Sequence, residues 1–120
     1  MNPQPPRSFR FVITEMLGSN AEGAPRRLLL EEKERVIGRS DQADLVVPLR
    51  TVSRRHAAAW AKDGEAFVRD LGSRSGTFVN SARVSGEPTP LRPGDRLSFR
   101  PNMVFVVSQE DVSPCVSMGR

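Results

Sequence analysis

Apolar and polar residues alternate along several short segments of the chain, and glycine or proline separates most segments from the next. A period of two is typical of a strand that buries one face, and clustered turn residues end such strands. The pattern therefore predicts an all-β domain of short strands, either a sandwich or a barrel. The predicted strands cover 9–16, 26–31, 35–37, 45–47, 66–69, 77–79, 96–99 and 103–107.

The segment 56–62 conflicts with this pattern, because it reads His-Ala-Ala-Ala-Trp-Ala-Lys and alanine favours helices over strands. The next residues, Lys-Asp-Gly-Glu at 62–65, are typical of a hairpin turn that leads into the strand at 66–69. We therefore predict a strand over 56–62. Large aromatic side chains are expected to fill the core, and these are Trp60, Phe67, Phe78, Phe99 and Phe105.

A chain of 120 residues is long enough for one domain with a buried core. Its two ends are rich in proline, serine and other polar residues, so we expect flexible tails at 1–8 and 109–120 around a domain at 9–108. No apolar run could span a membrane and no secretory signal pattern is present, so a cytoplasmic protein without a membrane partner is expected. A single cysteine and a single histidine cannot build a disulfide or a Cys/His zinc site, and we expect no metal and no cofactor.

The formal net charge of +4 is compatible with several anionic partners, namely nucleic acid, a membrane surface or a phosphorylated ligand. Lys33 and Lys62 are the only lysines, so almost all basic residues are arginines. Arginine binds phosphate through two parallel hydrogen bonds, although this bias can equally reflect codon composition. The arginines are scattered and interleaved with acids, so charge alone does not select a partner.

Four short motifs occupy the turns between predicted strands. They are Gly38-Arg39-Ser40, Val52-Ser53-Arg54-Arg55-His56-Ala57, Asp70-Leu71-Gly72-Ser73-Arg74-Ser75-Gly76-Thr77-Phe78-Val79-Asn80 and Leu91-Arg92-Pro93-Gly94-Asp95-Arg96-Leu97. In order and spacing, across 36–107, they resemble the forkhead-associated (FHA) family. The resemblance implies an FHA/SMAD-like β-sandwich of two antiparallel sheets that binds phosphothreonine peptides through loops at one end, without catalysis. It also implies a signalling role, with a phosphorylated partner protein and a Ser/Thr kinase upstream.

The chemistry of a phosphothreonine explains which loop residues would bind it. The phosphate brings a charge of about −1.5 to −2 and three strong acceptor oxygens, so its site needs a fixed cation and neutral donors. Arg39 and the hydroxyl of Ser53 meet these needs, and Arg54 is expected to be a second cation. Arg55 is a weaker candidate, because neighbouring side chains on an extended segment point in opposite directions.

Other motif residues are expected to support the loops. Gly38 would permit a tight exit from its strand. Gly76 and Thr77 would meet the backbone requirements of the turn into the next strand, where glycine supplies a conformation that other residues disfavour. By resemblance to the family, His56 is a structural residue that hydrogen-bonds within the loops and does not touch the ligand.

The chain departs from the family pattern at Ser75. Many FHA domains have Asn-Gly-Thr where this chain has Ser75-Gly76-Thr77, and that asparagine binds the peptide backbone. Serine reaches less far and offers a single hydroxyl. We expect the phosphate site to survive, with peptide anchoring either weakened at Ser75 or shifted to Arg74 and Asn80, although Asn80 also fits a hairpin turn.

Three other functions are compatible with the residues present. Ser53, His56 and Asp70 are the residue types of a hydrolase, but glycines of the nucleophile-elbow type do not surround Ser53. A nucleic-acid-binding β-domain is the second choice, and it would need exposed aromatic residues in a chain with six Phe, one Trp and no Tyr. The third is an interaction scaffold of the same fold that does not require phosphate, which the presence of Arg39 and Ser53 argues against.

Overall fold

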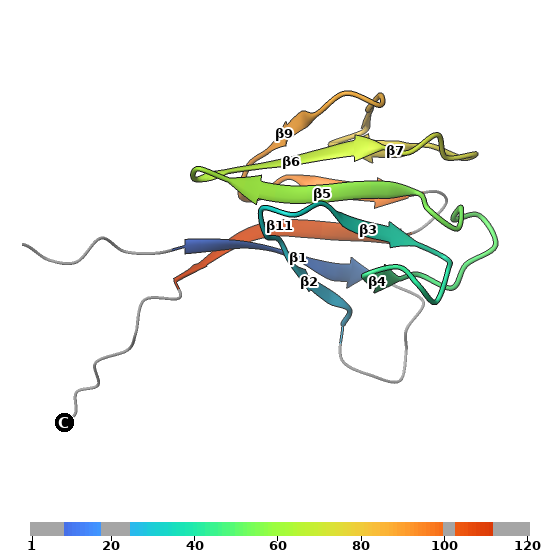
Figure 1. Ribbon diagram of the computed structural model, residues 1–120, viewed down its shortest axis with the longest axis horizontal. Coiled ribbons are helices and arrows are strands. Elements are labelled where there is room, and N and C mark those ends of the chain that lie inside the picture. Colours follow the sequence, from blue (N-terminus) through green and yellow to red (C-terminus); the bar gives the residue numbers. More distant parts are fainter. Residues whose placement is uncertain (1–8, 18–24, 100–102, 112–120) are drawn as a thin grey trace, which may run out of the picture.

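The computed structural model describes residues 9–17, 25–99 and 103–111, and these form two packed β-sheets (Figure 1). The strands are β1 (Phe9–Leu17), β2 (Arg27–Leu29), β3 (Arg35–Gly38), β4 (Leu45–Val46), β5 (Ala57–Lys62), β6 (Glu65–Asp70), β7 (Thr77–Val79), β8 (Ala82–Arg83), β9 (Thr89–Leu91), β10 (Arg96–Phe99) and β11 (Met103–Asp111). One sheet has the order β2-β1-β11-β10-β7-β8 and the other β4-β3-β5-β6-β9. The predicted β-sandwich is confirmed.

Nearly all strand neighbours are antiparallel, as predicted, and the exception among the described pairs is the short parallel pair of β3 and β4. Residues 57–62 of the alanine-rich segment form β5, which pairs along its whole length with β6, while His56 precedes the strand. The turn between them places Asp63 at φ 54° and Gly64 at φ +80°, as the predicted hairpin requires. Strand pairing thus overrides the helix propensity of alanine, because Ala57 and Ala59 are fully buried in the core.

Two strands and one boundary were not predicted. The short strands β8 and β9 lie at sheet edges, where they contribute few residues and no clear alternation. Strand β11 continues to Asp111, because Phe9 to Phe11 of β1 pair with it there. The expectation of a tail from residue 109 is therefore wrong for 109–111, while 1–8 and 112–120 lie outside the described residues.

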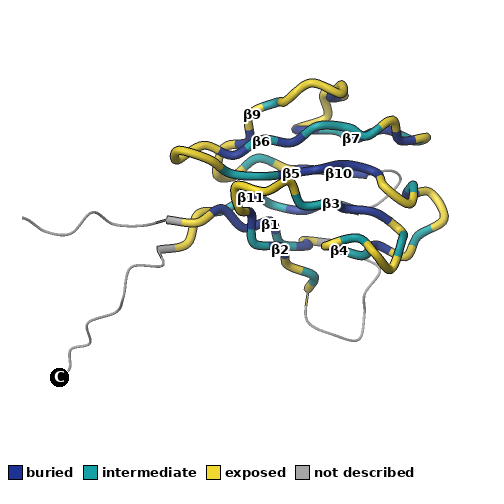
Figure 2. The backbone as a smooth tube through the Cα atoms, viewed as in Figure 1, coloured by how far each residue is buried: buried dark blue, intermediate teal, exposed yellow. Residues whose placement is uncertain are grey.

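The core lies between the sheets, and buried residues follow the strands while exposed residues gather at the turns (Figure 2). Phe99 and Phe105 belong to it as predicted, with 1% and 0% of their surface exposed. Trp60, Phe67 and Phe78 are only half-buried, so their core assignment is wrong. Because Ala59 and Val68 point into the core, their neighbours Trp60 and Phe67 point to the outer face of the sheet, where their rings stack 5.7 Å apart.

Strand pairing brings three loops to the same end of the sandwich. Ile37, near the end of β3, pairs with Ala57 at the start of β5, and Ala57 pairs with Asp70 at the end of β6. The loops 39–44, 47–56 and 71–76 therefore leave the sheet side by side, at the right of Figure 1, while the β5–β6 hairpin lies at the opposite end. Within the described ranges, no helix has the length and apolar character needed to cross a bilayer.

Candidate functional site

The exit of β3 packs tightly against the loop that carries Ser53. The backbone N–H groups of Arg39 and Ser40 donate hydrogen bonds to the carbonyls of Ser53 and Arg54, at 2.9 and 3.3 Å. A Cβ atom on Gly38 would lie 2.0 Å from the carbonyl oxygen of Arg54. Only glycine fits this close approach without a backbone shift, and the approach sets the position of Arg39.

The Arg39 side chain is oriented by a backbone carbonyl. Its Nε donates to the carbonyl of Val52 at 3.0 Å, and the terminal nitrogens of this exposed guanidinium carry four further N–H donors. Asp44 is engaged elsewhere, because its carboxylate accepts a hydrogen bond from the Val36 N–H at 2.7 Å and pairs with Arg35 at 3.5 Å. The guanidinium is therefore a held cation at the loop surface.

The hydroxyl of Ser53 joins two of the three loops. Its oxygen accepts a hydrogen bond from the backbone N–H of Arg74 at 3.0 Å. Because this contact uses an acceptor position, the hydroxyl proton of the half-buried Ser53 can still be donated to a ligand.

His56 lies beneath the loops, fully buried, with its ring edge against Phe99 at a centroid distance of 4.8 Å. Its Nδ1 accepts a hydrogen bond from the Ser53 N–H at 3.0 Å, so Nε2 carries the proton and donates it to the Gly76 carbonyl at 2.8 Å. Burial lowers the pKa of His56 below its ordinary value, although the hydrogen bond to Gly76 and the charge of Asp70 act in the opposite direction. The neutral His56 ring thus links the loops 47–56 and 71–76.

The carboxylate of Asp70 organises the third loop. Its Oδ1 accepts hydrogen bonds from the hydroxyls of Ser73 at 2.5 Å and Thr77 at 2.8 Å, and its Oδ2 accepts from the N–H groups of Gly72 at 2.9 Å and Ser73 at 2.8 Å. Burial raises the pKa of Asp70, but these four hydrogen bonds lower it more, so the net pKa lies below the ordinary value. Thr77 is fully buried.

The turn at Gly76 completes this loop. Its φ of +97° is a left-handed conformation that favours glycine, and its N–H donates to the Ser73 hydroxyl at 3.0 Å. Ser73 was not singled out from the sequence, although serine three residues after an aspartate is a recognisable side-chain-to-backbone turn signal.

Ser75 makes a contact that could not be predicted. Its hydroxyl donates to the carbonyl of Thr51 at 2.6 Å, which joins the loops 47–56 and 71–76 a second time. At this position, where many family members carry a peptide-binding asparagine, the serine proton is already used within the domain. Arg54, Arg55 and Arg74 are exposed nearby.

Asn80 lies apart from these contacts, at the other end of β7. Asn80 and Ser81 have φ values of 50° and 75° and form the turn between β7 and β8. The Asn80 amide donates to Asp95 at 3.0 Å and accepts from the Arg96 N–H at 2.9 Å. Both ends of the amide are engaged, so the interpretation of Asn80 as a hairpin residue accounts for it better than peptide binding.

The three hydrolase candidates do not form a triad. Both ring nitrogens of His56 contact backbone groups, and the Asp70 carboxylate is occupied by its own loop. The Ser53 hydroxyl therefore has no imidazole base beside it in this arrangement.

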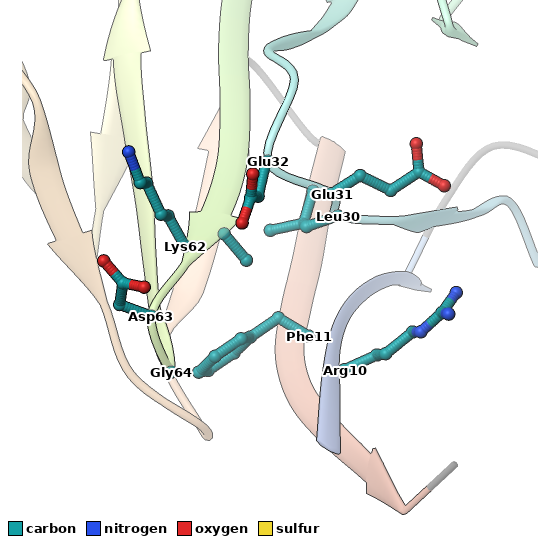
Figure 3. Close-up of a pocket in the computed structure, with 9 residues that line it drawn as sticks. Arg10, Phe11, Leu30, Glu31, Glu32, Lys62, Asp63 and Gly64 are labelled. Carbon is teal, nitrogen blue, oxygen red and sulfur yellow. The ribbon is translucent and has the colours of Figure 1, made fainter. Parts of the chain in front are cut away.

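The end of the sandwich remote from the loops has a depression of about 400 Å³ (Figure 3). In the close-up, Lys62 and Asp63 of the β5–β6 hairpin lie on one side and the Phe11 ring extends toward that hairpin. The complete lining is Arg10, Phe11, Leu30, Glu31, Glu32, Ala61, Lys62, Asp63 and Gly64. Charges of both signs line it, so it lacks the concentration of cations found at the loops. Across the described ranges, no group of three His, Cys, Asp or Glu residues is placed to hold a metal ion.

Comparison with known proteins agrees with the motifs and the fold. The FHA domain family model matches residues 35–100, which contain all three loops. The chain belongs to the FHA family. Over 103 residues this FHA domain is 40% identical to the oxoglutarate dehydrogenase inhibitor of Corynebacterium diphtheriae, an alignment that covers 85% of the chain and 68% of the relative.

Other relatives are longer than the shared region. The domain is 41% identical over 76 residues to a protein phosphatase 1 regulatory inhibitor subunit PPP1R8 homolog of Arabidopsis thaliana, covering 61% of the chain and 21% of that protein. It is 33% identical over 81 residues to FhaB of Mycolicibacterium smegmatis, covering 68% of the chain and 52% of the relative. The chain therefore spans about half or less of these two relatives.

Solved structures show the same fold. One, from a structural and functional study of phosphothreonine-dependent FHA domain interactions, has a TM-score of 0.70 and 28% identity, and covers 82% of this chain and 95% of that one. Another, the FhaA FHA domain in complex with the intracellular domain of Rv3910, has a TM-score of 0.68 and 29% identity, and covers 81% of this chain and 98% of that one.

Proposed function

We propose that this FHA domain is a non-catalytic module that binds phosphothreonine peptides on the three loops. Arg39, Ser53 and Arg54 would contact the phosphate, while Arg74 and Ser75 would face the peptide. The observation that carries the proposal is the pairing of a held guanidinium on Arg39 with a Ser53 hydroxyl whose oxygen is already hydrogen-bonded and whose proton can be donated.

This arrangement suits a phosphate for electrostatic reasons. Charge-assisted hydrogen bonds are roughly twice as strong as neutral ones, and a cation held in place loses little side-chain freedom when the ligand binds. Arg39 is held through Val52, and Ser53 is held through His56 and Arg74. Arg54 is exposed beside them and would supply a second positive charge.

A module of this kind recruits a partner after a Ser/Thr kinase has phosphorylated it. The kinase, the partner and the cytoplasmic setting in which they would meet stay predictions. The related FhaA domain in complex with an intracellular domain supports a protein partner.

The test is isothermal titration with a phosphothreonine peptide, its unphosphorylated twin, a phosphoserine version and single-stranded DNA. The phosphothreonine peptide should bind at least about tenfold more tightly than its twin, because charged hydrogen bonds to a phosphate contribute about 1.5–3 kcal/mol each. Arg39→Ala and Ser53→Ala should remove most of this difference. Arg92→Ala, an exposed arginine at the remote end, is the matched control.

Thermal melts of every variant separate a binding defect from unfolding. Equal affinity for the two twins, or an undiminished difference in a folded Arg39→Ala variant, would show that the loops do not bind phosphate. Preferential binding of the DNA would favour the nucleic-acid alternative.

A further inference from the structure

Arginines on the flanks of the sandwich pair with carboxylates. Arg26 pairs with the buried Glu15 at 3.1 Å, and Arg69 pairs with Glu34 at 3.0 Å. Arg35 contacts Glu31 at 3.1 Å as well as Asp44. These three arginines thus form ion pairs with carboxylates of the domain itself.

Arginines at the loop end lack such partners. No aspartate or glutamate occurs in 45–62 or in 71–86, although the chain contains 14 acidic residues. All of the arginines in these two stretches are exposed, and within the described part of the chain no carboxylate forms an ion pair with them; they are Arg50, Arg54, Arg55, Arg74 and Arg83.

Three carboxylates on the loops or at the strand ends that lead into them have other partners. Asp70 accepts four hydrogen bonds from its own loop, and Asp44 accepts from Val36 and pairs with Arg35. Asp41 contacts the neighbouring Gln42 side chain at 3.4 Å. The positive charge at the loop end is therefore in excess of what a single phosphate requires.

Two contacts bring further arginines close to the Ser75 turn. The Ser75 hydroxyl donates to the carbonyl of Thr51, and Arg50 is the residue before Thr51. The Nε atom of Arg83 lies 3.2 Å from the position that a Cβ on Gly76 would occupy. Arg74 precedes Ser75 in the chain. Three arginines are therefore adjacent, in the chain or through these contacts, to the turn in which an uncharged asparagine is common in the family.

We propose that the ligand of this domain is an acidic phosphopeptide, in which carboxylates or a second phosphate near the phosphothreonine bind Arg50, Arg74 and Arg83. This inference rests on the proposed function and adds the class of sequence that the site selects. Charge on the peptide side chains then replaces part of the backbone anchoring that an asparagine would provide.

The expected gain is moderate, because the arginines are exposed. One exposed charge pair changes a binding constant by up to about fivefold, and the factors of separate pairs multiply. Two added negative charges at about threefold each should therefore tighten binding by about tenfold at low salt. The gain should shrink as salt is raised, since the screening length is about 10 Å at 0.1 M ionic strength and shorter above it.

The test uses fluorescence anisotropy with one phosphothreonine peptide in four forms: neutral neighbours, aspartate neighbours before or after the phosphothreonine, and a second phosphothreonine. An unphosphorylated aspartate-rich peptide is the fifth probe. The double variant Arg50→Gln/Arg83→Gln should bind the neutral form as the wild type does but lose most of the advantage of the acidic forms. Arg92→Gln/Arg96→Gln removes the same charge from exposed residues outside the two acid-free stretches and should keep that advantage.

The outcomes distinguish failure of this inference from failure of the proposed function. If the wild type binds neutral and acidic phosphopeptides equally well, the inference is overturned while phosphothreonine binding stands. If the preference for acidic over neutral phosphopeptides falls equally in both double variants, that preference reflects net charge alone. This result would overturn the assignment to Arg50 and Arg83. If the unphosphorylated acidic peptide binds as tightly as its phosphorylated counterpart, the proposed function and the inference both fail.

Discussion

The backbone N–H of Ser53 donates a hydrogen bond to Nδ1 of His56, three residues later, at 3.0 Å. Only the unprotonated nitrogen can accept this bond, so the protonation state of a fully buried ring is coupled to the position of Ser53, which we propose to contact the phosphate. The same ring holds Gly76 through Nε2, and a change at His56 therefore affects two loops.

The first prediction is that stability falls as pH drops below 6.5, the ordinary pKa of histidine. The folded state has the lower pKa, so between the two pKa values the unfolded chain binds more protons, and acidification favours unfolding. Above pH 6.5 this contribution is fully present, and it is lost as pH falls toward the folded pKa. Urea unfolding midpoints at pH 7.5 and 5.5 measure the effect. No peptide is added, because a peptide phosphate itself titrates at about pH 6.

The control for this prediction is His56→Asn, which should lower the midpoint at pH 7.5 but flatten its pH dependence. His56 is the only histidine in the chain, so a residual step in the same pH window would have to come from another group. A wild-type midpoint that stays constant or rises on acidification contradicts the expected direction.

The second prediction concerns Gly38→Ala. The new methyl group would meet the Arg54 carbonyl oxygen at 2.0 Å, so the backbone of one loop must move. We expect a loss of at least about 2 kcal/mol in the free energy of unfolding, since overpacking of a tight site typically costs about 1–3 kcal/mol. Chemical denaturation measures it, with Gly86→Ala as the control.

At Gly86 the nearest atom to an added Cβ, the Asp70 carbonyl oxygen, is 3.7 Å away, which is ordinary contact. The control should therefore change stability by no more than about 0.5 kcal/mol. Equal stabilities for the two glycine variants would mean that the β3 exit is more adaptable than its geometry indicates.

The third prediction is that Asp70→Asn destabilises the domain. In the aspartate, Oδ2 accepts hydrogen bonds from the backbone N–H groups of Gly72 and Ser73. An asparagine keeps one oxygen acceptor but would place an NH₂ donor opposite these two N–H groups. Loss of hydrogen bonds to a charged group should cost about 1–3 kcal/mol at pH 7, discounted here because Asp70 is partly exposed. Thermal or urea unfolding provides the measurement.

The acid side of the same experiment has a defined sign. The folded pKa of Asp70 is below its model-compound value of 3.8, so the wild type keeps this stabilisation above pH 3.8 and loses it as pH falls further. Asp70→Asn should lack that acid-dependent step, whereas Asp63→Asn in the exposed β5–β6 turn should retain it. If Asp70→Asn loses stability below pH 3.8 as the wild type does, that loss must come from other carboxylates.

The fourth prediction separates two roles of Ser75. Ser75→Ala removes the hydrogen bond to Thr51 and should cost about 1 kcal/mol of stability. Ser75→Asn introduces the amide that many family members use to hold the peptide backbone, and should tighten binding of a phosphothreonine peptide with neutral neighbours by about fivefold, the value of one net hydrogen bond. Titrations with that peptide would refute this expectation if the asparagine variant, still folded, bound more weakly than the wild type.

Several features of this protein were predictable because they depend on local sequence. Turn residues and alternating strands predicted an all-β sandwich or barrel, and the resemblance to the FHA family implied the sandwich. The hairpin signal at 62–65 correctly outweighed the helix propensity of the alanines in β5. Local sequence did not predict that the motif turns with Arg39, Ser53 and Ser75 lie side by side. The family resemblance implied it, and it arises because the strands that lead into and out of these turns are neighbours in one sheet or face it.

Other features were missed because they depend on which strands pair. Trp60 and Phe67 are large aromatic residues, and only the inward position of Ala59 and Val68 places them outside the core. Strands β8 and β9 are short edge strands without a clear alternating pattern. Asn80 was a candidate for peptide binding until its amide was found bonded to Asp95 and Arg96.

The sequence alone determined the residue types at the loops: a glycine at the end of β3 with an arginine after it, Ser53 three residues before His56, and two long stretches without acidic residues. Tertiary structure alone decided what these residues contact. The bonds from His56 to Gly76, from Ser75 to Thr51 and from Arg74 to Ser53 join positions 20 or more residues apart. Such partners become neighbours only when antiparallel pairing fixes the register of β5 and β6, which local propensity does not encode.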